Sequence, residues 1–320
     1  MRRAVKWLAG AATVGMFLVL VMGATVTNTG SAQGCGQDWP LCNGRFIPSF
    51  AVSFAVGTLI EWSHRAVTGV EGVLIVATAA GAWWYWRRRP EIKVLAPLML
   101  AFLVLQAALG AWAVVYGQAV EVLALHFGVS LVAFASVLLT FLFVLQADGD
   151  LDALRDRALP AGLRRAAWAL TAYIYVVVYL GAYVRHTDTM LACRDWPLCN
   201  GQVFPGFSGA VGIVFAHRLA AGLGVVALGW LALRAWRLRA ARPDLWVAAA
   251  VAFALILLQA LSGAIVVWTA VGLFSALLHS ALVALLFGAL TYLCLQSLPR
   301  PSAARAPAVP PYAAAPSRAG

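Results

Sequence analysis

The sequence predicts an all-α membrane protein whose eight transmembrane helices form two parallel four-helix-bundle repeats. Of the 320 residues, 63% are hydrophobic and 11% are charged, and the mean hydropathy is +0.86. Soluble globular proteins are nearer to one half apolar, so the composition excludes that class. The chain also contains eight apolar runs, each long enough to supply the roughly 20 residues of a membrane-spanning helix. A third observation, an internal repeat, is described below.

The eight runs are too long for membrane-spanning strands, so helices are expected. They lie near residues 5–27, 60–86, 94–116, 120–146, 166–186, 212–235, 245–268 and 272–297. The first run follows a basic start, as in a signal peptide. It is longer than the central region of a signal peptide and has no clear cleavage site, so we expect it to be retained as a helix.

The positive charges predict how the helices are oriented. Lys and Arg residues precede the first run and lie between the second and third, the fourth and fifth, and the sixth and seventh runs, whereas the opposite loops contain Arg45 and Arg194. By the positive-inside rule the basic segments and both termini are cytoplasmic. The net charge of +11 therefore follows topology and does not indicate nucleic-acid binding. Because no Arg- and Ser-rich transit peptide precedes the first run, we expect the bacterial inner (plasma) membrane.

A shift of 153 residues superimposes polar landmarks of the first half on the second. The pairs are His64-Arg65 with His217-Arg218, His126 with His279, and Gln106 to Gly110 with Gln259 to Gly263. Because three landmarks share one offset, the sequence predicts a duplication. Each repeat has an even number of spans, so both begin on the cytoplasmic side and are related by an axis along the membrane normal.

The repeat divides the chain into four segments. We expect an N-terminal repeat over 1–146, a cytoplasmic linker over 147–165, a C-terminal repeat over 166–297 and a cytoplasmic tail over 298–320. The tail combines Pro, Ala and Arg without periodicity, which is typical of disorder.

The four repeated histidines are predicted to bind heme iron. Ionisable side chains inside a membrane are unfavourable and usually mark function. Counted from the expected helix starts, His64 and His126 lie about 7 to 11 Å below the outer boundary, and His217 and His279 share those depths. Two histidines at one level in an apolar bundle are typical of axial heme ligation, whereas zinc or copper would require more ligands. For a single histidine, a bond to a backbone carbonyl is the alternative.

Two further pairs of polar residues accompany the histidines. Arg65 and Arg218 lie near the outer surface, where they suit heme propionates or, alternatively, snorkel to the headgroups. Gln106 and Gln259, each four residues before a glycine, are expected to be structural. Both the arginines and the glutamines recur at the 153-residue offset, so the two halves have them in common.

Glu61 is matched by Val214, so only the first half has an acid beside its histidine. Three residues before His64, it lies on the same helix face and could transfer protons or stabilise a developing cation. Alternatively, Thr58-Leu-Ile-Glu61 forms a capping box at the start of the helix. Glu71, matched by Gly224, faces the same side deeper down and is a lesser proton-path candidate.

The external loops contain two cysteine pairs, Cys35 with Cys42 and Cys193 with Cys199, around a shared Asp-Trp-Pro-Leu-Cys-Asn-Gly sequence. An oxidising compartment makes both pairs candidate disulfides. Three interpretations stay open: a static staple, a redox pair that exchanges with a thiol partner, and a zinc site shared by both loops, although tight C-x-x-C spacing is missing. Cys294 is expected to be a small core residue.

Together, Glu61-x-x-His64-Arg65, His126, His217-Arg218, His279, the eight spans and the cysteine loop resemble the heme A synthase family over residues 5–297. The resemblance implies an oxidoreductase that converts a ring methyl of heme O, through hydroxylation steps, into the formyl group of heme A for terminal oxidases. It implies heme O as substrate at His64 and His126, heme b at His217 and His279, and Glu61 as the essential acid. It places the chain among the cysteine-containing bacterial forms.

The resemblance also implies partners, and other functions remain as alternatives to it. Heme O synthase would donate the substrate, an unidentified protein would donate electrons, and the pocket would open to membrane lipid; a homo-oligomer is left open. A di-heme b-type electron-transfer protein is one rival, but a transmembrane electron path would place hemes towards opposite faces, whereas all four histidines lie near one. A membrane thiol oxidoreductase using the loop cysteines, or a heme-handling transporter, is another, and a thiol enzyme would not require the histidines.

Overall fold

The computed structural model describes residues 1–48, 55–147 and 159–298. Within these ranges the chain forms eight long helices and no strand, and each helix is long and apolar enough to cross a membrane. The predicted all-α fold with eight spans is thereby confirmed. The helices are α1 (Arg2–Asn28), α2 (Val56–Trp86), α3 (Pro90–Val115), α4 (Val120–Gln146), α6 (Ala161–His186), α7 (Gly209–Trp236), α8 (Pro243–Trp268) and α9 (Leu273–Ser297).

Three helices begin four or five residues earlier than the hydropathy pattern predicts. α2 begins at Val56 rather than near residue 60, α3 at Pro90 rather than near residue 94, and α6 at Ala161 rather than near residue 166. Hydropathy marks only the part of a helix that lies in lipid, whereas these first turns contain polar or charged residues such as Arg164 and Arg165. Residues 161–165 of the expected linker therefore belong to α6, while most of that linker and nearly all of the expected tail lie outside the described residues.

Three helices of the first half begin 153 residues before three helices of the second half. Val56, Pro90 and Val120 start α2, α3 and α4, and the corresponding starts are Gly209, Pro243 and Leu273. The prolines are suited to the first helical position, where no N–H group is needed for an intrahelical bond. The spacing found in the polar landmarks thus extends to the helix boundaries.

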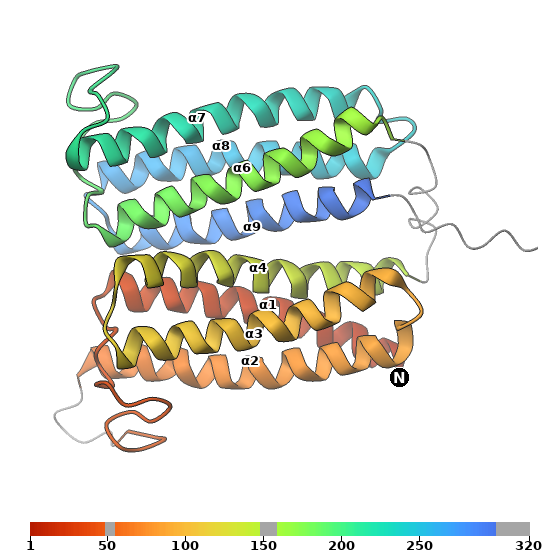
Figure 1. Cartoon of the computed structure of the whole chain (residues 1–320), viewed down its shortest axis with the longest axis horizontal. Coiled ribbons are helices and arrows are strands. Elements are labelled where there is room, and N and C mark those ends of the chain that lie inside the picture. The colour runs from red at the N-terminus through yellow and green to blue at the C-terminus, as the bar shows by residue number, and fades with distance from the viewer. Residues whose placement is uncertain (49–54, 148–158, 299–320) are drawn as a thin grey trace, which may run out of the picture.

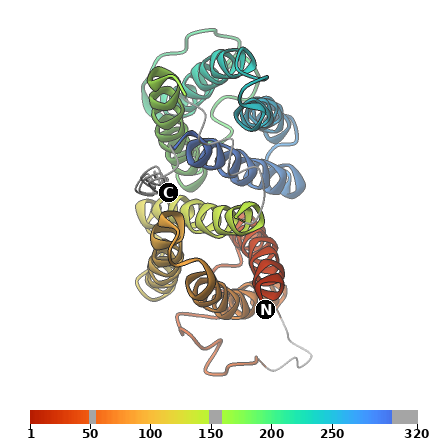
Figure 2. The same cartoon turned by 90° about the vertical axis from the view of Figure 1, so that its right-hand side faces the viewer.

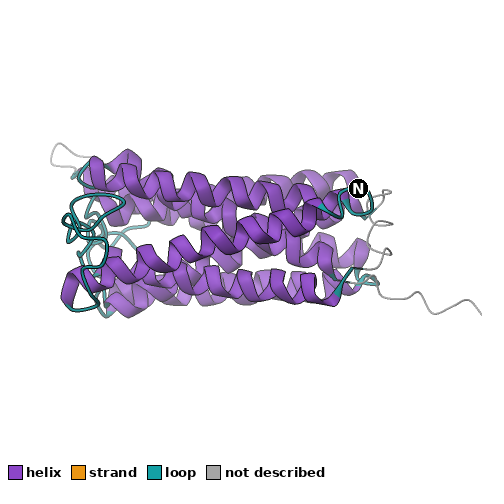
Figure 3. Cartoon of the chain, turned by 90° about the horizontal axis from the view of Figure 1, so that it is seen from above, coloured by secondary structure: helices purple, strands orange, loops and turns teal. Residues whose placement is uncertain are grey.

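The helices pack in two groups of four (Figure 1). In the first group α1 and α3 each contact α2 and α4; in the second, α6 and α8 each contact α7 and α9. The end-on view in Figure 2 shows each group as a ring of four helices. The groups meet where α4 contacts α6 and α9, and where α1 contacts α9. Figure 3 shows the connections gathered at the two ends of the bundle, with the helices between them.

The two groups share close van der Waals packing and hydrogen bonds. Gly128 of α4 lies against the ring of Tyr179, and Gly288 of α9 lies against the Leu138 side chain. Small residues at such positions let helices approach closely in lipid, where van der Waals contact drives association. At the end that bears the cysteine loops, the Arg185 guanidinium donates to Asn28 Oδ1 over 3.1 Å. These contacts fix the position of one group relative to the other.

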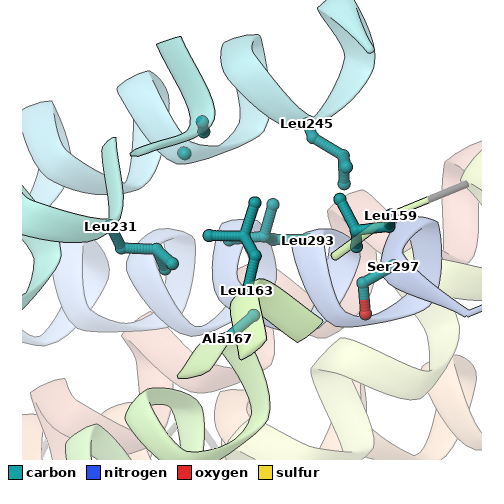
Figure 4. Close-up of a pocket in the computed structure, with 9 residues that line it drawn as sticks. Leu159, Leu163, Ala167, Leu231, Leu245, Leu293 and Ser297 are labelled. Atoms are coloured by element: carbon teal, nitrogen blue, oxygen red, sulfur yellow. The ribbon is translucent and has the colours of Figure 1, made fainter. Parts of the chain in front are cut away.

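Figure 4 shows an apolar pocket between α6, α7, α8 and α9, lined by Leu163, Leu231, Leu245 and Leu293 among others. Leu231 follows His217 by 14 positions on α7, or about 21 Å along the helix. No titratable side chain lines this pocket. It is therefore a packing feature of the second group and not a candidate site.

Candidate functional site

The four predicted histidines lie at matching depths in the two groups. His64 follows the first residue of α2 by eight positions, and His217 follows the first residue of α7 by the same number. His126 in α4 and His279 in α9 each follow the helix start by six positions. At 1.5 Å per residue these positions are about 12 and 9 Å from the helix ends that carry the cysteine loops. Each group therefore presents two histidines at nearly one level.

Within each group the two histidines lie near one another. His64 and His126 are close enough for charges on their rings to interact, and so are His217 and His279. His186, the fifth histidine, is the last residue of α6, and it too is close enough to His126 for charges on the two rings to interact. Among the described residues, no group of three or more His, Cys, Asp or Glu side chains is placed to hold a metal ion.

Each of these four histidines rests against a glycine of the neighbouring helix. A methyl group built on the glycine would lie only 2.9 to 3.5 Å from Cε1 of the imidazole. The pairs are His64 with Gly23 of α1, His126 with Gly110 of α3, His217 with Gly181 of α6 and His279 with Gly263 of α8. The contact is tightest at Gly181, where a methyl group would force the His217 ring to move, and loosest at Gly110, where it would just touch the His126 ring. The sequence pattern identified Gly110 and Gly263 as packing residues but missed Gly23 and Gly181, which are 158 rather than 153 positions apart.

Of the four site histidines, His279 alone has a hydrogen-bond partner at Nδ1 within the described residues. Within the described chain, Nδ1 of His64, His126 and His217 is buried without a hydrogen-bond partner. In contrast, His279 Nδ1 lies 2.8 Å from the Ser262 hydroxyl, and Gln259 Nε2 lies 3.1 to 3.2 Å from both ring nitrogens. Buried polar atoms are normally satisfied, so the unpartnered nitrogens are free to bind a ligand.

Gln259, expected to be structural, thus contacts a site histidine. Ser262 was not identified from the sequence. Its counterpart at the 153-residue offset is Leu109, so a comparison of the two halves at this position would have revealed a polar group in only one of them. The corresponding glutamine, Gln106, is buried, and its Oε1 has no partner within the described chain.

Glu61 connects the first histidine pair to the loop above it. The side chain is 3% exposed, and it lies three positions before His64 on α2. Its Oε2 accepts a hydrogen bond from the Cys35 N–H over 2.8 Å, and its Oε1 accepts one from Arg65 Nη2 over 2.5 Å. A carboxylate with two such donors is held in one orientation. Glu61 is therefore a fixed acid at the edge of this site.

The capping-box interpretation of Glu61 is wrong. The N-cap of α2 is Ala55, and no side chain caps the helix. The Thr58 hydroxyl donates instead to the Gly34 carbonyl over 2.7 Å. The reason is that α2 begins earlier than expected, so Thr58 lies inside the first turn rather than at the position from which a capping side chain acts.

The two arginines hold the cysteine loops. Nη1 of Arg65 donates to the carbonyl oxygens of Asp38 and Leu41, both over 2.6 Å. Nη1 of Arg218 donates to the matching carbonyls of Asp195 and Leu198 over 2.7 and 2.6 Å, and its Nη2 donates to the Cys193 carbonyl over 3.0 Å. Backbone carbonyls of the loops therefore accept most of the hydrogen bonds that each guanidinium donates, a contact that neither the snorkelling nor the propionate interpretation predicted. A role towards propionates stays a prediction.

The two loops adopt the same local structure. The carboxylates of Asp38 and Asp195 accept from the N–H groups of Gly44 and Gly201 over 2.8 and 2.7 Å. Bonds from the backbone of Gly201 and Asn200 hold the pKa of Asp195 below its usual value. The two glycines have φ of +78° and +76°, a conformation that favours glycine. In each turn an aspartate carboxylate thus accepts a hydrogen bond from the backbone N–H of the glycine six residues later.

Disulfides join Cys35 to Cys42 and Cys193 to Cys199 within their own loops. Bonded in this way, none of the four sulfurs is a thiolate that could bind zinc. The geometry is compatible with both a staple and an exchanging pair. Cys294 is free and buried, and its sulfur lies 3.2 Å from the Thr171 hydroxyl, as expected for a core residue.

Comparison with known proteins gives a consistent result. Residues 6–291 match the family model described as "Cytochrome oxidase assembly protein". The chain is 41% identical over 298 residues to heme A synthase of Geobacillus kaustophilus (strain HTA426), covering 93% of each chain. It is also 41% identical over 293 residues to heme A synthase of Bacillus cereus (strain 03BB102), covering 92% of this chain and 93% of the relative. Heme A synthase of Bacillus anthracis (strain CDC 684 / NRRL 3495) matches to the same extent.

The loop contacts generate a first prediction. Arg218→Lys is expected to loosen residues 193–201, because an ammonium group cannot donate to three carbonyls in the geometry of the guanidinium fork. Amide hydrogen exchange in this loop should accelerate by about tenfold or more, as expected for the loss of one or two charge-assisted hydrogen bonds. Arg194→Lys, on the exposed part of the same loop, is the control and should leave exchange unchanged. Equal exchange in the two variants would contradict the proposed anchoring.

Proposed function

Because the chain belongs to the cytochrome oxidase assembly protein family, in which relatives at 41% identity are heme A synthases, we propose that it is itself a heme A synthase. The enzyme is an oxidoreductase that converts heme O into heme A through hydroxylation of a ring methyl. The observation that carries this proposal is the doubled histidine pair with an acid, Glu61, beside only one of the two pairs. One pair then serves a reacting heme and the other a resident heme.

The residues present fit two heme groups. Each pair supplies two imidazoles at one level, and a glycine behind each ring leaves the space that the ring needs. Three of the four Nδ1 atoms are buried without a partner, as expected where a further group completes the site. His64 and His126 would hold heme O, and His217 and His279 would hold heme b. When bound, the iron supplies the redox chemistry that oxidises the methyl group.

The second site is built for permanent binding. The Ser262 hydroxyl meets His279 Nδ1 at 2.8 Å, and Gln259 Nε2 lies 3.1 Å from His279 Nε2, so the ring is held from two sides. Such an outer contact typically raises the affinity of a histidine for iron. In the first half Leu109 takes the place of Ser262, so His126 lacks this support. A substrate heme has to enter and leave, and looser ligation serves that need.

The first site has the reactive carboxylate. Glu61 lies one turn from His64 and is held by Arg65 and by the Cys35 N–H. In this position it can accept a proton released at the reacting methyl or stabilise positive charge that develops there. Val214 at the matching place of the second half can do neither.

The cysteine loops lie at the helix ends next to the sites, and Arg65 of α2 and Arg218 of α7 hold them there. We infer that they face the outside of a bacterial inner membrane, with both termini in the cytoplasm, because the basic connections lie at the opposite ends of the helices. The disulfides would then form in an oxidising compartment. Heme O synthase would deliver the substrate, whose apolar tail suits entry from lipid, and a further protein would exchange electrons with heme b. The common offset of helix starts and histidines supports a tandem duplication with parallel repeats.

The decisive experiment is to identify the hemes bound to the full-length protein. After coexpression with a source of heme O, acid-acetone extraction and chromatography should release heme A or hydroxylated heme O together with heme B. The same extraction without the heme O source is the control and should give heme B alone. Heme B alone under both conditions would contradict a synthase and would favour electron transfer.

Two substitutions should separate the sites. Glu61→Ala is expected to retain heme b but to lower product formation by about 100-fold or more, the usual effect of removing an acid or base that acts in catalysis. His217→Ala is expected to lose heme b itself, because only one ligand remains. The heme b spectrum and the extracted product report the two effects independently. Full turnover in Glu61→Ala would disprove the catalytic role of this residue.

Ser262→Ala should weaken the resident site. The loss of its contact with His279 Nδ1 is expected to lower heme b affinity by about tenfold, within the range known for outer contacts of metal ligands. Transfer of heme b to an excess of apomyoglobin measures this change, and the midpoint potential provides a second reading. Ser280→Ala is the matched control, because the Ser280 hydroxyl donates to the Ala276 carbonyl instead of the ring. If both variants hold heme b equally well, Ser262 does not support the ligand.

A further inference from the structure

Glu71 is a second acid of the first half, and the proposed chemistry does not use it. Its side chain on α2 is 3% exposed. Neither carboxyl oxygen has a hydrogen-bond partner within the described chain. An unpaired carboxylate in an apolar, membrane-spanning bundle is strongly unfavourable. Glu71 therefore carries a proton at rest and is a carboxylic acid rather than half of an ion pair.

The carboxyl points into the contact between α2 and α1. A methyl group built on Gly15 of α1 would overlap Glu71 Oε2, so the carboxyl in this position lies directly against the glycine. On the same pair of helices, Gly23 leaves room for the ring of His64. Glu71 follows His64 by seven positions, or two turns, which places it on the same helix face about 10 Å further from the cysteine loops. The acid thus lies directly below the reacting site.

The polar face continues below Glu71. Thr78 follows by a further two turns, is fully buried at 0% exposure and has a hydroxyl without a partner among the described residues. The spacing of about 10 Å between successive groups exceeds one hydrogen bond, so water molecules would be required as bridges. His64, Glu71 and Thr78 then mark a line along α2 from the site towards the opposite end of the bundle.

The second half has no such line. At the 153-residue offset Gly224 replaces Glu71 and Leu231 replaces Thr78. The space beside Gly224 is occupied by the side chains of Ile174 and Ile256. The second group therefore packs with only apolar side chains at these positions, so the four-helix fold does not require Glu71 or Thr78. The polar groups of α2 serve a need that only the first half has.

We propose that Glu71 carries protons between the reacting heme site and the end of the bundle opposite the cysteine loops. This inference rests on the proposed function. Converting a methyl into a hydroxymethyl group with oxygen from water releases two electrons and two protons. With oxygen from O2, the same change consumes two electrons and two protons and forms one water. In either case Glu71 gives its proton to one neighbour and takes another from the opposite side, so that the carboxyl is unchanged after each cycle.

The test compares Glu71→Gln with wild type in the full-length protein, coexpressed with a source of heme O. Glutamine keeps the size of the side chain but cannot release a proton. Heme b content should stay at the wild-type level, while product formation should fall by at least about tenfold. Redox-induced infrared difference spectra give a second reading: the C=O band of a protonated carboxylic acid should be present in wild type and missing in Glu71→Gln. Glu71→Asp should restore part of the product and shift the band.

Thr140→Val is the matched control. Thr140 is buried in the same half at 0% exposure, but its hydroxyl already bonds to Met99 and to the Ser136 carbonyl. It should keep both the product and the infrared band. If Glu71→Gln loses heme b, Glu71→Asp decides: reduced product with a shifted band supports the proposal, and unchanged product with an unchanged band overturns it.

The two hypotheses fail differently. If wild type itself forms neither heme A nor hydroxylated heme O, the proposed function is wrong. If wild type forms product and Glu71→Gln forms as much, or if the acid band is the same in both, Glu71 carries no protons and the inference is overturned.

Discussion

The contact between an imidazole ring and a glycine of the neighbouring helix is the constraint on which the structure depends. It occurs four times: an added methyl group would collide with the ring at Gly181, press on it at Gly23 and Gly263, and reach van der Waals contact with it at Gly110. The histidines enter from α2, α4, α7 and α9, whereas the glycines lie on α1, α3, α6 and α8. Every helix of the bundle thus contributes either one of these histidines or the glycine that lies beside it. Helices α2, α4, α7 and α9 therefore have to keep a fixed position along their neighbours, so that each histidine stays opposite its glycine.

The loops are tied to the same helices that carry the ligands. Arg65 and Arg218 directly follow site histidines and bind the backbone of the loop above. In the first half this link also includes Glu61, which joins the guanidinium to the Cys35 N–H. A change in the Cys35–Cys42 disulfide would therefore alter the hydrogen bond that Glu61, beside His64, accepts from the Cys35 N–H. In the second half Val214 interrupts the connection.

Much of this architecture could be predicted from the sequence, because bilayer thickness dictates helix length and a repeated offset identifies equivalent residues. The eight spans and the family are confirmed. The early starts of α2, α3 and α6 could not be predicted, since turns outside lipid have no hydropathy signal. The partners of Arg65 and Arg218 are backbone carbonyls, which leave no trace in side-chain patterns. Gly23 and Gly181 were missed because their offset differs from that of the other landmarks.

The differences between the halves explain how one framework can support two tasks. Where the second half has Ser262, the first has Leu109, and where the second has Val214, Gly224 and Leu231, the first has Glu61, Glu71 and Thr78. Support for a ligand is thus found in one half, and groups able to exchange protons are found in the other. A duplicated bundle would begin with identical sites, and few substitutions separate a firm cofactor site from a reactive one. In the proposed function the shared glycines and histidines would hold the hemes, and the unshared polar residues would decide which of the two reacts.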